Sequence, residues 1–300
     1  MPRSTSRPVP ALLPPPDARL GDPALTETSG LTASPAGPGR FWAINDSGNA
    51  ARVHALNANG DALGSFAVAA RNRDWESLSS GVLDGVATLV IGETGDNLRH
   101  HEGAALLLVA EPELATAPSG AVDGTPLPVR RLAFVYEDGP RDVEALSLTG
   151  GAVWLLDKPP LAADGSRRPS GVYRLEPFER SGSATAGAAP AVARRVGEFL
   201  APSGGLIARL AASVAGVDLG YPTGLELDAQ RGHAWVLTYR DVLRYDRVGE
   251  EPWERTLARA PARRIAHGLA QAEALALDAS GAVVVSSEGR AAPLLAIVPD

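Results

Sequence analysis

Residues 142–158 read DVEALSLTGGAVWLLDK, and this stretch decides the fold. On either side of Gly150 and Gly151 the residues follow the pattern of two β-strands joined by a tight turn. The same order of features recurs at four other places, which indicates a repeat of β-hairpins. One residue near the start of each repeat can be aligned, and we call these five the anchor residues: Ser29, Glu76, Glu144, Thr223 and Glu273.

Each anchor is followed by an apolar second strand, and in three repeats this strand carries a tryptophan at the same position: Trp42, Trp154 and Trp235. A third strand follows in every repeat, and a fourth in all but the last. We expect the fourth strands at residues 63–68, 130–136, 192–199 and 255–265. Because the chain ends after the third strand of the last repeat, we expect residues 18–25 to pair with it and join the two ends of the chain.

The shorter anchor spacings, 47 and 50 residues, fit the four-stranded blade of a β-propeller. The longer spacings contain the Pro-rich insertion 115–128, the Ser/Ala/Gly-rich insertion 181–191 and a predicted short helix at 205–214. We therefore predict an all-β chain with one propeller domain at residues 17–300, after a disordered Pro-rich leader at 1–16. Five blades are expected, and the alternative is a sixth, degenerate blade around residues 196–220.

Composition excludes several classes of function. The chain of 300 residues has a net charge of -7, so its overall field repels nucleic acid and anionic membranes. It contains no cysteine, which excludes disulfides, thiolate metal sites and thiol catalysis. No signal peptide and no membrane span is evident in the sequence. We expect a soluble monomer, cytoplasmic as written, or secreted if a signal peptide has been removed.

In a propeller the start of each first strand lies beside the end of the second strand, at one mouth of the central channel. The predicted mouth therefore gathers acidic residues, for which we expect a metal-ligand set of Glu76, Glu144, Glu273, Asp46 and Glu93. Carboxylates this close cannot all ionise unpaired. Ca²⁺, which binds oxygen ligands, would neutralise them, whereas a general acid/base pair or purely structural hydrogen bonds are the alternatives.

Loops beside the predicted mouth supply further candidates for binding a ligand. Asx and Gly residues are ordinary turn residues, but here they occur at the same point of two consecutive repeats. The candidate ligand-binding residues are Asn45, Trp75, Asp96, Asn97, Asp157 and Glu288.

Lys158 is the only lysine in the chain and follows the second strand of the central repeat. Its ammonium group could pair with the acidic residues or meet the oxyanion of a substrate. Lys158 and Glu144 are therefore the candidate catalytic residues. No serine-hydrolase elbow, phosphate loop or dinucleotide fingerprint accompanies them.

The segments 42–49, 74–78, 91–97, 142–146 and 286–289 together resemble a group of bacterial, often actinobacterial, β-propeller proteins of unassigned function. This group is distantly similar to phytase-like and lactonase-like propellers, and that similarity implies Ca²⁺ in or near the central channel. The resulting hypothesis is an acidic channel mouth that binds Ca²⁺ and a small polar ligand and hydrolyses a phosphoester or a lactone. The alternative is a non-catalytic binding module or scaffold for an unknown protein partner.

Overall fold

A computed structural model describes residues 13–114, 121–163, 166–176, 190–202 and 219–298, with side chains omitted at 121–123. The prediction of an all-β chain is confirmed, because β-strands dominate these residues and the one labelled helix, α2 (Trp253–Leu257), is short. No helix within this part of the chain has the length and apolar character to span a membrane. The predicted helix at 205–214, and most of the leader, of the insertion 181–191 and of the degenerate blade, lie outside the described residues.

The strands form antiparallel meanders that succeed one another along the chain. The first contains β1 (Thr28–Ala33), β2 (Arg40–Asn45), β3 (Arg52–Asn57) and β4 (Ala62–Val68). The second contains β5 (Trp75–Leu83), β6 (Val86–Glu93), β7 (Ala104–Ala110) and β9 (Val129–Tyr136). Strand β8 (Ala121–Leu127), which lies in the expected insertion 115–128, pairs in parallel with the outer edge of β4.

The third meander contains β10 (Val143–Thr149), β11 (Ala152–Asp157), β12 (Ser170–Leu175) and β13 (Ala191–Phe199). Parallel pairing of β13 with β9 joins it to the second meander in one eight-stranded sheet. The fourth contains β14 (Pro222–Asp228), β15 (His233–Thr238), β16 (Asp241–Asp246) and β17 (Arg263–Ala266), and the last contains β18 (Ala272–Leu277), β19 (Val283–Ser287) and β20 (Leu295–Ile297).

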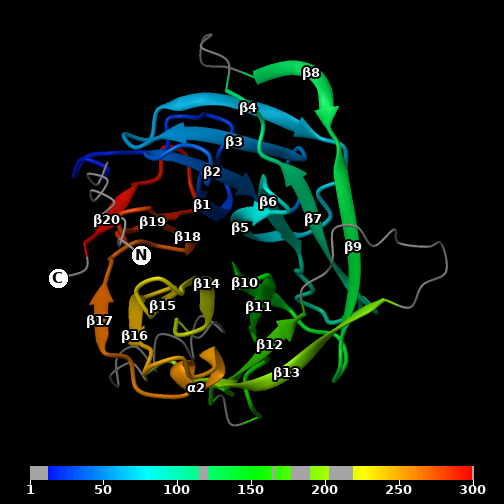
Figure 1. Ribbon diagram of the computed structural model, residues 1–300, viewed down its shortest axis with the longest axis vertical. Coiled ribbons are helices and arrows are strands. Elements are labelled where there is room, and N and C mark those ends of the chain that lie inside the picture. Colours follow the sequence, from blue (N-terminus) through cyan, green and yellow to red (C-terminus); the bar gives the residue numbers. More distant parts are fainter. Residues whose placement is uncertain (1–12, 115–120, 164–165, 177–189, 203–218, 299–300) are drawn as a thin grey trace, which may run out of the picture.

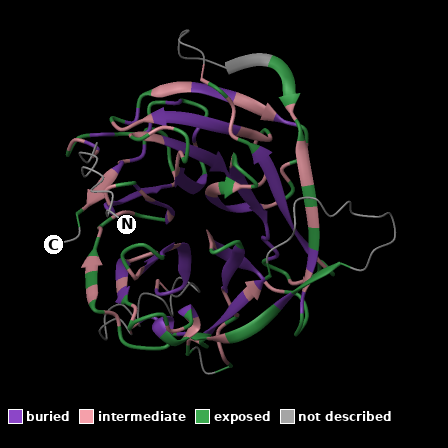
Figure 2. Ribbon diagram, viewed as in Figure 1, coloured by how far each residue is buried: buried purple, intermediate pink, exposed green. Residues whose placement is uncertain are grey.

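The first strands of the meanders surround a common centre (Figure 1). Strand β1 contacts β5, β5 contacts β10, β10 contacts β14, β14 contacts β18, and β18 contacts β1 again. The inner strands are mostly buried, whereas outer strands such as β13 and β17 alternate or are largely exposed (Figure 2). The ring of contacts therefore brings the starts of all these first strands to one place.

The hairpin at residues 142–158 forms as its sequence predicts. Thr149 pairs with Ala152, and the intervening Gly150 and Gly151 have φ angles of 59° and 75°. A turn with two positive φ angles matches the twist of the flanking strands and favours glycine at both positions.

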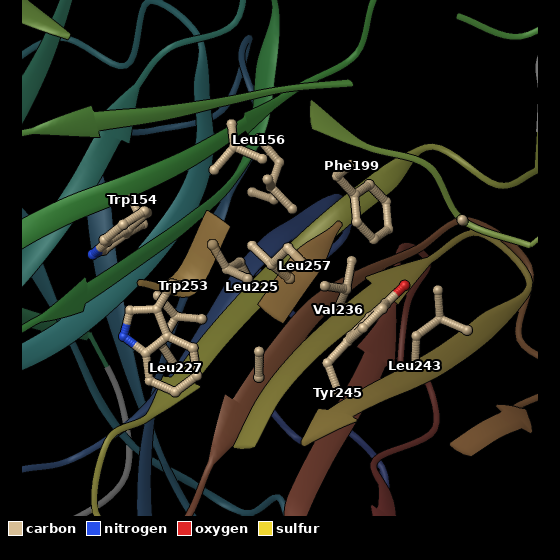
Figure 3. Close-up of a cluster of buried hydrophobic side chains, with 14 residues drawn as sticks. Trp154, Leu156, Phe199, Leu225, Leu227, Val236, Leu243, Tyr245, Trp253 and Leu257 are labelled. Carbon is tan, nitrogen blue, oxygen red and sulfur yellow. The ribbon is translucent and has the colours of Figure 1, made fainter. Parts of the chain in front are cut away.

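The shared tryptophan register is also confirmed. Trp42 pairs with Thr32, Trp154 with Ser147 and Trp235 with Glu226, in each case the residue three positions after the anchor. Between the third and fourth meanders, Trp154 belongs to a cluster with Leu225, Tyr245 and Trp253 (Figure 3). Burying side chains of this size contributes about 1.5–3 kcal/mol each, so the meanders are held together mainly by these clusters.

The expected fourth strand at 255–265 is wrong in its first part. Residues 253–257 form helix α2, and the strand begins only at Arg263. Pro252 is the N-cap residue, with φ -59° and ψ 145°, so its missing amide hydrogen removes no bond within the helix. Trp253 and Leu257, four positions apart, then lie on one face and are both buried, which is the helical rather than the strand period.

The two ends of the described chain meet beside the last meander. The Leu20 amide donates to the Ala292 carbonyl at 2.9 Å, and the Leu294 amide donates to the Ala18 carbonyl at 2.9 Å. The pairing is a short antiparallel bridge rather than a full strand over 18–25. Asp22 anchors the same segment to β3 through a contact of 2.8 Å with His54.

Candidate functional site

Each first strand begins with a β-bulge at its anchor residue. The pairing register shifts between Thr28 and Gly30 in β1, and at the corresponding position in β5, β10, β14 and β18. The anchors are thus the extra, unpaired residues at five equivalent places. A bulge leaves its residue out of the ladder and re-aims its side chain, and bulges are common beside functional sites.

The two small anchors have structural partners. Ser29 Oγ donates to the carbonyl of Trp75 at 2.6 Å, and Thr223 Oγ1 donates to the carbonyl of Ala272 at 2.6 Å. Each bond runs from one first strand to the start of the next first strand in the ring. These anchors therefore link neighbouring meanders, and the acidic character at the starts of the first strands depends on the three glutamates.

Around Glu144 the negative charge is compensated. Its Oε1 forms an ion pair with the Lys158 ammonium, and its Oε2 accepts a hydrogen bond from the Tyr239 hydroxyl at 3.2 Å. Lys158 Nζ also lies 3.6 Å from Asp142 Oδ2. The single lysine thus sits among the acidic residues, where a compact cation stabilises the nearby carboxylates.

Around Glu76 the compensation is weaker, because burial and the charges of Asp46 and Asp74 outweigh the attraction of Lys158. The residue is 6% exposed, and among the described residues its carboxylate has no hydrogen bond or ion pair. Carboxylate oxygens of Asp46, Asp74 and Glu76 lie within 4.8 Å of one another. Burial, followed by the charges of Asp46 and Asp74, holds the pKa of Glu76 well above its usual range. Burial is also the main cause of the raised pKa values of Asp46 and Asp74.

Gly95 forms one wall of this acidic cluster. A Cβ atom at that position would lie 2.4 Å from Asp74 Oδ2 and 2.6 Å from Glu76 Oε1. The main chain of Gly95 therefore packs directly against these two carboxylates, and a side chain at residue 95 would clash with them.

The third glutamate, Glu273, lies near Tyr239 and Glu288. Burial and the neighbouring Glu288 carboxylate raise the pKa of Glu273 to about 8. Burial also raises the pKa of Glu288. This part of the mouth can therefore hold a proton between two carboxyl groups near neutral pH.

A register effect separates the predicted residues at the ends of the second strands. Asn45, Glu93 and Asp157 are directly paired with Thr28, Trp75 and Val143. The residue that follows each of these is the one that turns toward the mouth, as Asp46 and Lys158 do. In the second meander that residue is Thr94, whose hydroxyl donates to the Val143 carbonyl at 2.8 Å.

This shift places Glu93 away from the acidic cluster. Its Oε1 contacts Arg131 at 2.9 Å and Arg73 at 3.5 Å, and all three residues line a cavity of about 480 Å³. Because two arginines hold the Glu93 carboxylate there, we leave it out of the ligand set proposed below. The alignment of the repeats predicts Gly92 and Glu93 at the acidic cluster, whereas the residue equivalent to Asp46 and Lys158 is the next one, Thr94.

The remaining ligand-binding candidates are distributed as follows. Asn45 Oδ1 accepts from the amides of Thr26 and Glu27, both at 3.1 Å, so it holds the loop before β1. Trp75 is fully buried in a hydrophobic cluster and does not form a wall of the mouth. Its position at the start of β5 instead serves to pack two meanders together.

Asp96, Asn97 and Asp157 lie around the loop that follows β6 and at the end of β11. The Asp96 carboxylate accepts from the amides of His100 and His101 at 2.8 Å each, and the Asp96 amide donates to Asp142 Oδ1 at 3.0 Å. Asn97 is exposed. Asp157 accepts from the Gly171 amide at 2.6 Å and faces a separate cavity.

Sequence reasoning missed Asp74, Asp142 and Tyr239. A signal for the first two was present, since Asp-x-Glu begins both Asp74-Trp75-Glu76 and Asp142-Val143-Glu144. Tyr239 follows the end of its second strand as Asp46 and Lys158 follow theirs, and the same register rule would have found it.

Comparisons with known proteins add little to this description. A scan against protein-family models and a search of curated proteins find no match. Among solved structures, Kuenenia stuttgartiensis hydrazine synthase is 13% identical with a TM-score of 0.43, covering 91% of this chain and 71% of that chain. A ctPRC2 complex with H3K27me3 and H3K27M is 11% identical with a TM-score of 0.41, covering 89% and 72%. At these TM-scores neither similarity supports an argument about function.

Proposed function

We propose that the chain is a five-bladed β-propeller whose acidic mouth binds Ca²⁺ through Asp46, Asp74 and Glu76. Five meanders follow one another among the described residues, their first strands contact one another in a closed ring, and a terminal bridge joins 18–20 to 292–294. In this arrangement the terminal bridge closes the ring and leaves the bulged anchors at one end of a central channel.

The observation that supports cation binding best is the unpartnered carboxylate of Glu76. A buried carboxylate without a partner is costly, and a cation supplies the missing charge. Ca²⁺ binds oxygens at about 2.3–2.6 Å, so ligands on opposite sides of one ion lie about 5 Å apart. The spacing of the three carboxylates, all within 4.8 Å, fits this requirement.

The same mouth supports a hydrolytic activity on a small polar phosphoester or lactone. A bound Ca²⁺ would supply Lewis acidity and lower the pKa of a bound water. Lys158 is held by Glu144 and Asp142, so its ammonium is fixed beside the acidic cluster, where it would stabilise developing negative charge. Glu144 in this proposal positions Lys158 and is not a ligand of the ion.

A second candidate, a non-catalytic binding module, is favoured by one observation. The ion pair between Lys158 and Glu144, with Tyr239 bonded to the same carboxylate, satisfies these groups without any ligand. In that case the mouth stabilises the ring, and the surrounding loops contact a protein partner.

Calorimetric titration of the EDTA-treated protein with CaCl₂ tests the proposal. We expect binding by the wild-type protein, a large loss of affinity in Glu76→Gln, and a similar loss in Gly95→Ala because its methyl group would clash with the carboxylates of Asp74 and Glu76 and displace them. Glu93→Gln is the matched control, since it removes a carboxylate of the same kind in another cavity. No heat with wild-type protein, or equal losses in Glu76→Gln and Glu93→Gln, would remove the cation site.

Turnover separates the two candidate functions. If a panel of phosphoesters and lactones is hydrolysed only with Ca²⁺, and Lys158→Met lowers kcat while Ca²⁺ affinity is kept, the mouth is catalytic. If Ca²⁺ binds and no member of the panel is hydrolysed, the binding module is the better account.

A further inference from the structure

A second polar cavity lies on the other side of the strand end that carries Lys158. It has a volume of about 390 Å³, and its charged and aromatic wall is formed by Arg99, Arg141, Arg168, Arg195, Asp157, Glu198 and Tyr173. This volume is in the range of sites that bind small molecules. Successive residues of a strand point to opposite faces, so Asp157 faces this cavity and Lys158 faces the mouth.

Two of the four arginines are already neutralised by carboxylates. Arg141 contacts Asp138 at 2.7 Å and Asp157 at 3.4 Å, and its Nε donates to the Tyr173 hydroxyl at 2.6 Å. Arg195 contacts Glu198 at 2.8 Å. These contacts fix the orientation of Arg141, Tyr173 and Arg195 in the wall of the cavity.

The other two arginines form no ion pair with a carboxylate within the described residues, although Arg99 acts on the charge of Asp157 at longer range. Arg99 Nη2 donates to the main-chain carbonyl of Lys158, which holds the side chain against the cavity without neutralising it. Arg168 is exposed at the rim and has no ion pair in this part of the chain. The lining residues thus include four arginines against Asp157 and Glu198, so the cavity carries a net positive charge in a chain that is negative overall.

Among the described residues of the wall, Asp157 is the only buried acidic one, and it does not offset this charge fully. It is 4% exposed and accepts a hydrogen bond from the Gly171 amide at 2.6 Å. Burial raises its pKa to about 6, with Arg141, Arg99 and Arg195 opposing that shift. Its role in the cavity is to hold Gly171 and Arg141 in place.

We propose that this cavity binds the phosphate or carboxylate group of a small anionic ligand, with Arg99 and Arg168 as its direct partners. The planar guanidinium group matches both oxyanions because it can donate two parallel hydrogen bonds. Tyr173 and Arg141 form the polar back wall on which the anion rests. The proposal does not depend on cation binding at the mouth.

Calorimetric titration of the protein with inorganic phosphate, and separately with succinate, tests whether this cavity binds an anion. Both titrations are made in EDTA at constant ionic strength, so a failure of the Ca²⁺ site does not affect them. We expect at least one of the two anions to bind, and the better binder identifies the preferred oxyanion. The double variant Arg99→Ala/Arg168→Ala should bind about tenfold more weakly or worse, since hydrogen bonds to charged groups are the strong ones.

Arg255→Ala is the matched control, because Arg255 is an exposed arginine on α2 that does not line the cavity. It should leave the affinity unchanged, and thermal unfolding of each variant checks that it is folded. Should the double variant fail to fold, Arg168→Ala alone decides, since this exposed side chain can be removed without disturbing the core. No binding of either anion to wild-type protein, unchanged affinity in the arginine variants, or an equal loss in Arg255→Ala would overturn the proposal.

Discussion

Two segments of the molecule share the pattern Asp-x-Glu and the same bulge, yet their carboxylates have different surroundings. At Asp142-Val143-Glu144 the ammonium of Lys158 contacts both acidic side chains. At Asp74-Trp75-Glu76 the residue equivalent to Lys158 is Thr94, and a carboxylate oxygen of Asp46 lies within 4.8 Å of both acidic side chains. One facing residue therefore decides whether a buried carboxylate has a cationic partner, and the segment without one is where we propose that Ca²⁺ binds.

Removing the Lys158 ammonium beside Asp142 and Glu144 should have the largest effect on the free energy of unfolding. Lys158→Met leaves Glu144 buried and unpaired, and breaking a buried ion pair from one side typically costs about 3–5 kcal/mol. We expect a loss near the lower end of this range in urea unfolding at pH 8 without Ca²⁺, because Tyr239 still donates to the carboxylate.

The double variant Lys158→Met/Glu144→Gln should recover most of that loss, because no uncompensated charge remains. Lys158→Arg, which keeps the charge, serves as the control. A change in unfolding free energy below about 0.5 kcal/mol for Lys158→Met, the usual size of a surface substitution, would mean that the pair contributes little.

Adding Ca²⁺, which we propose binds at the segment Asp74-Trp75-Glu76, should have the next largest effect on the free energy of unfolding. At a Ca²⁺ concentration one hundred times the dissociation constant, linkage predicts stabilisation by about 2.7 kcal/mol. Thermal unfolding of wild-type protein should therefore shift upward by several degrees with Ca²⁺, and Glu76→Gln should lose this shift. Glu144→Gln should keep it, and an equal loss in both variants would remove the distinction between the segments.

The pH dependence of stability should differ between the apo and Ca²⁺-loaded protein. Carboxyl groups with raised pKa values in the folded state, such as Glu76 and Glu273, bind more protons folded than unfolded, so stability falls as pH rises. For Glu273 this window runs from its ordinary value to about 8. Ca²⁺ should weaken the dependence by neutralising Glu76, and Glu273→Gln should weaken it independently. Urea unfolding between pH 5 and 8 measures this, and apo stability that rises across the window would contradict the assignment.

The smallest effect should come from the small anchors. Ser29→Ala removes the hydrogen bond to the Trp75 carbonyl, and we expect a loss of about 1 kcal/mol in unfolding free energy. Ca²⁺ affinity should not change, because Ser29 links strands and contacts none of the three proposed ligands. A loss of Ca²⁺ affinity measured by calorimetry would show instead that all anchors act together at the mouth.

The strand pattern and the anchors could be predicted from sequence because they rest on local rules. The alternation around Gly150 and Gly151, and the tryptophan that pairs with the residue three positions after each of three anchors, are repeated features that survive insertions. The strand expected from residue 255 was wrong, since Trp253 and Leu257 follow the helical period instead.

The composition of the candidate site was less predictable. The sequence predicts Glu93 where the structure places Thr94. A shift of one residue along a strand exchanges its two faces, and a single sequence without aligned homologues does not fix that register. The basic cavity was missed since its arginines come from four separate segments of the chain, and only the tertiary fold brings them together.

A crystal structure grown with CaCl₂ after EDTA treatment tests the central claim most directly. The account predicts one ion bonded to carboxylate oxygens of Asp46, Asp74 and Glu76 at about 2.4 Å, with Lys158 still paired to Glu144. An ion bound at Glu144 with Lys158 displaced, or no ion beside Glu76, would contradict it.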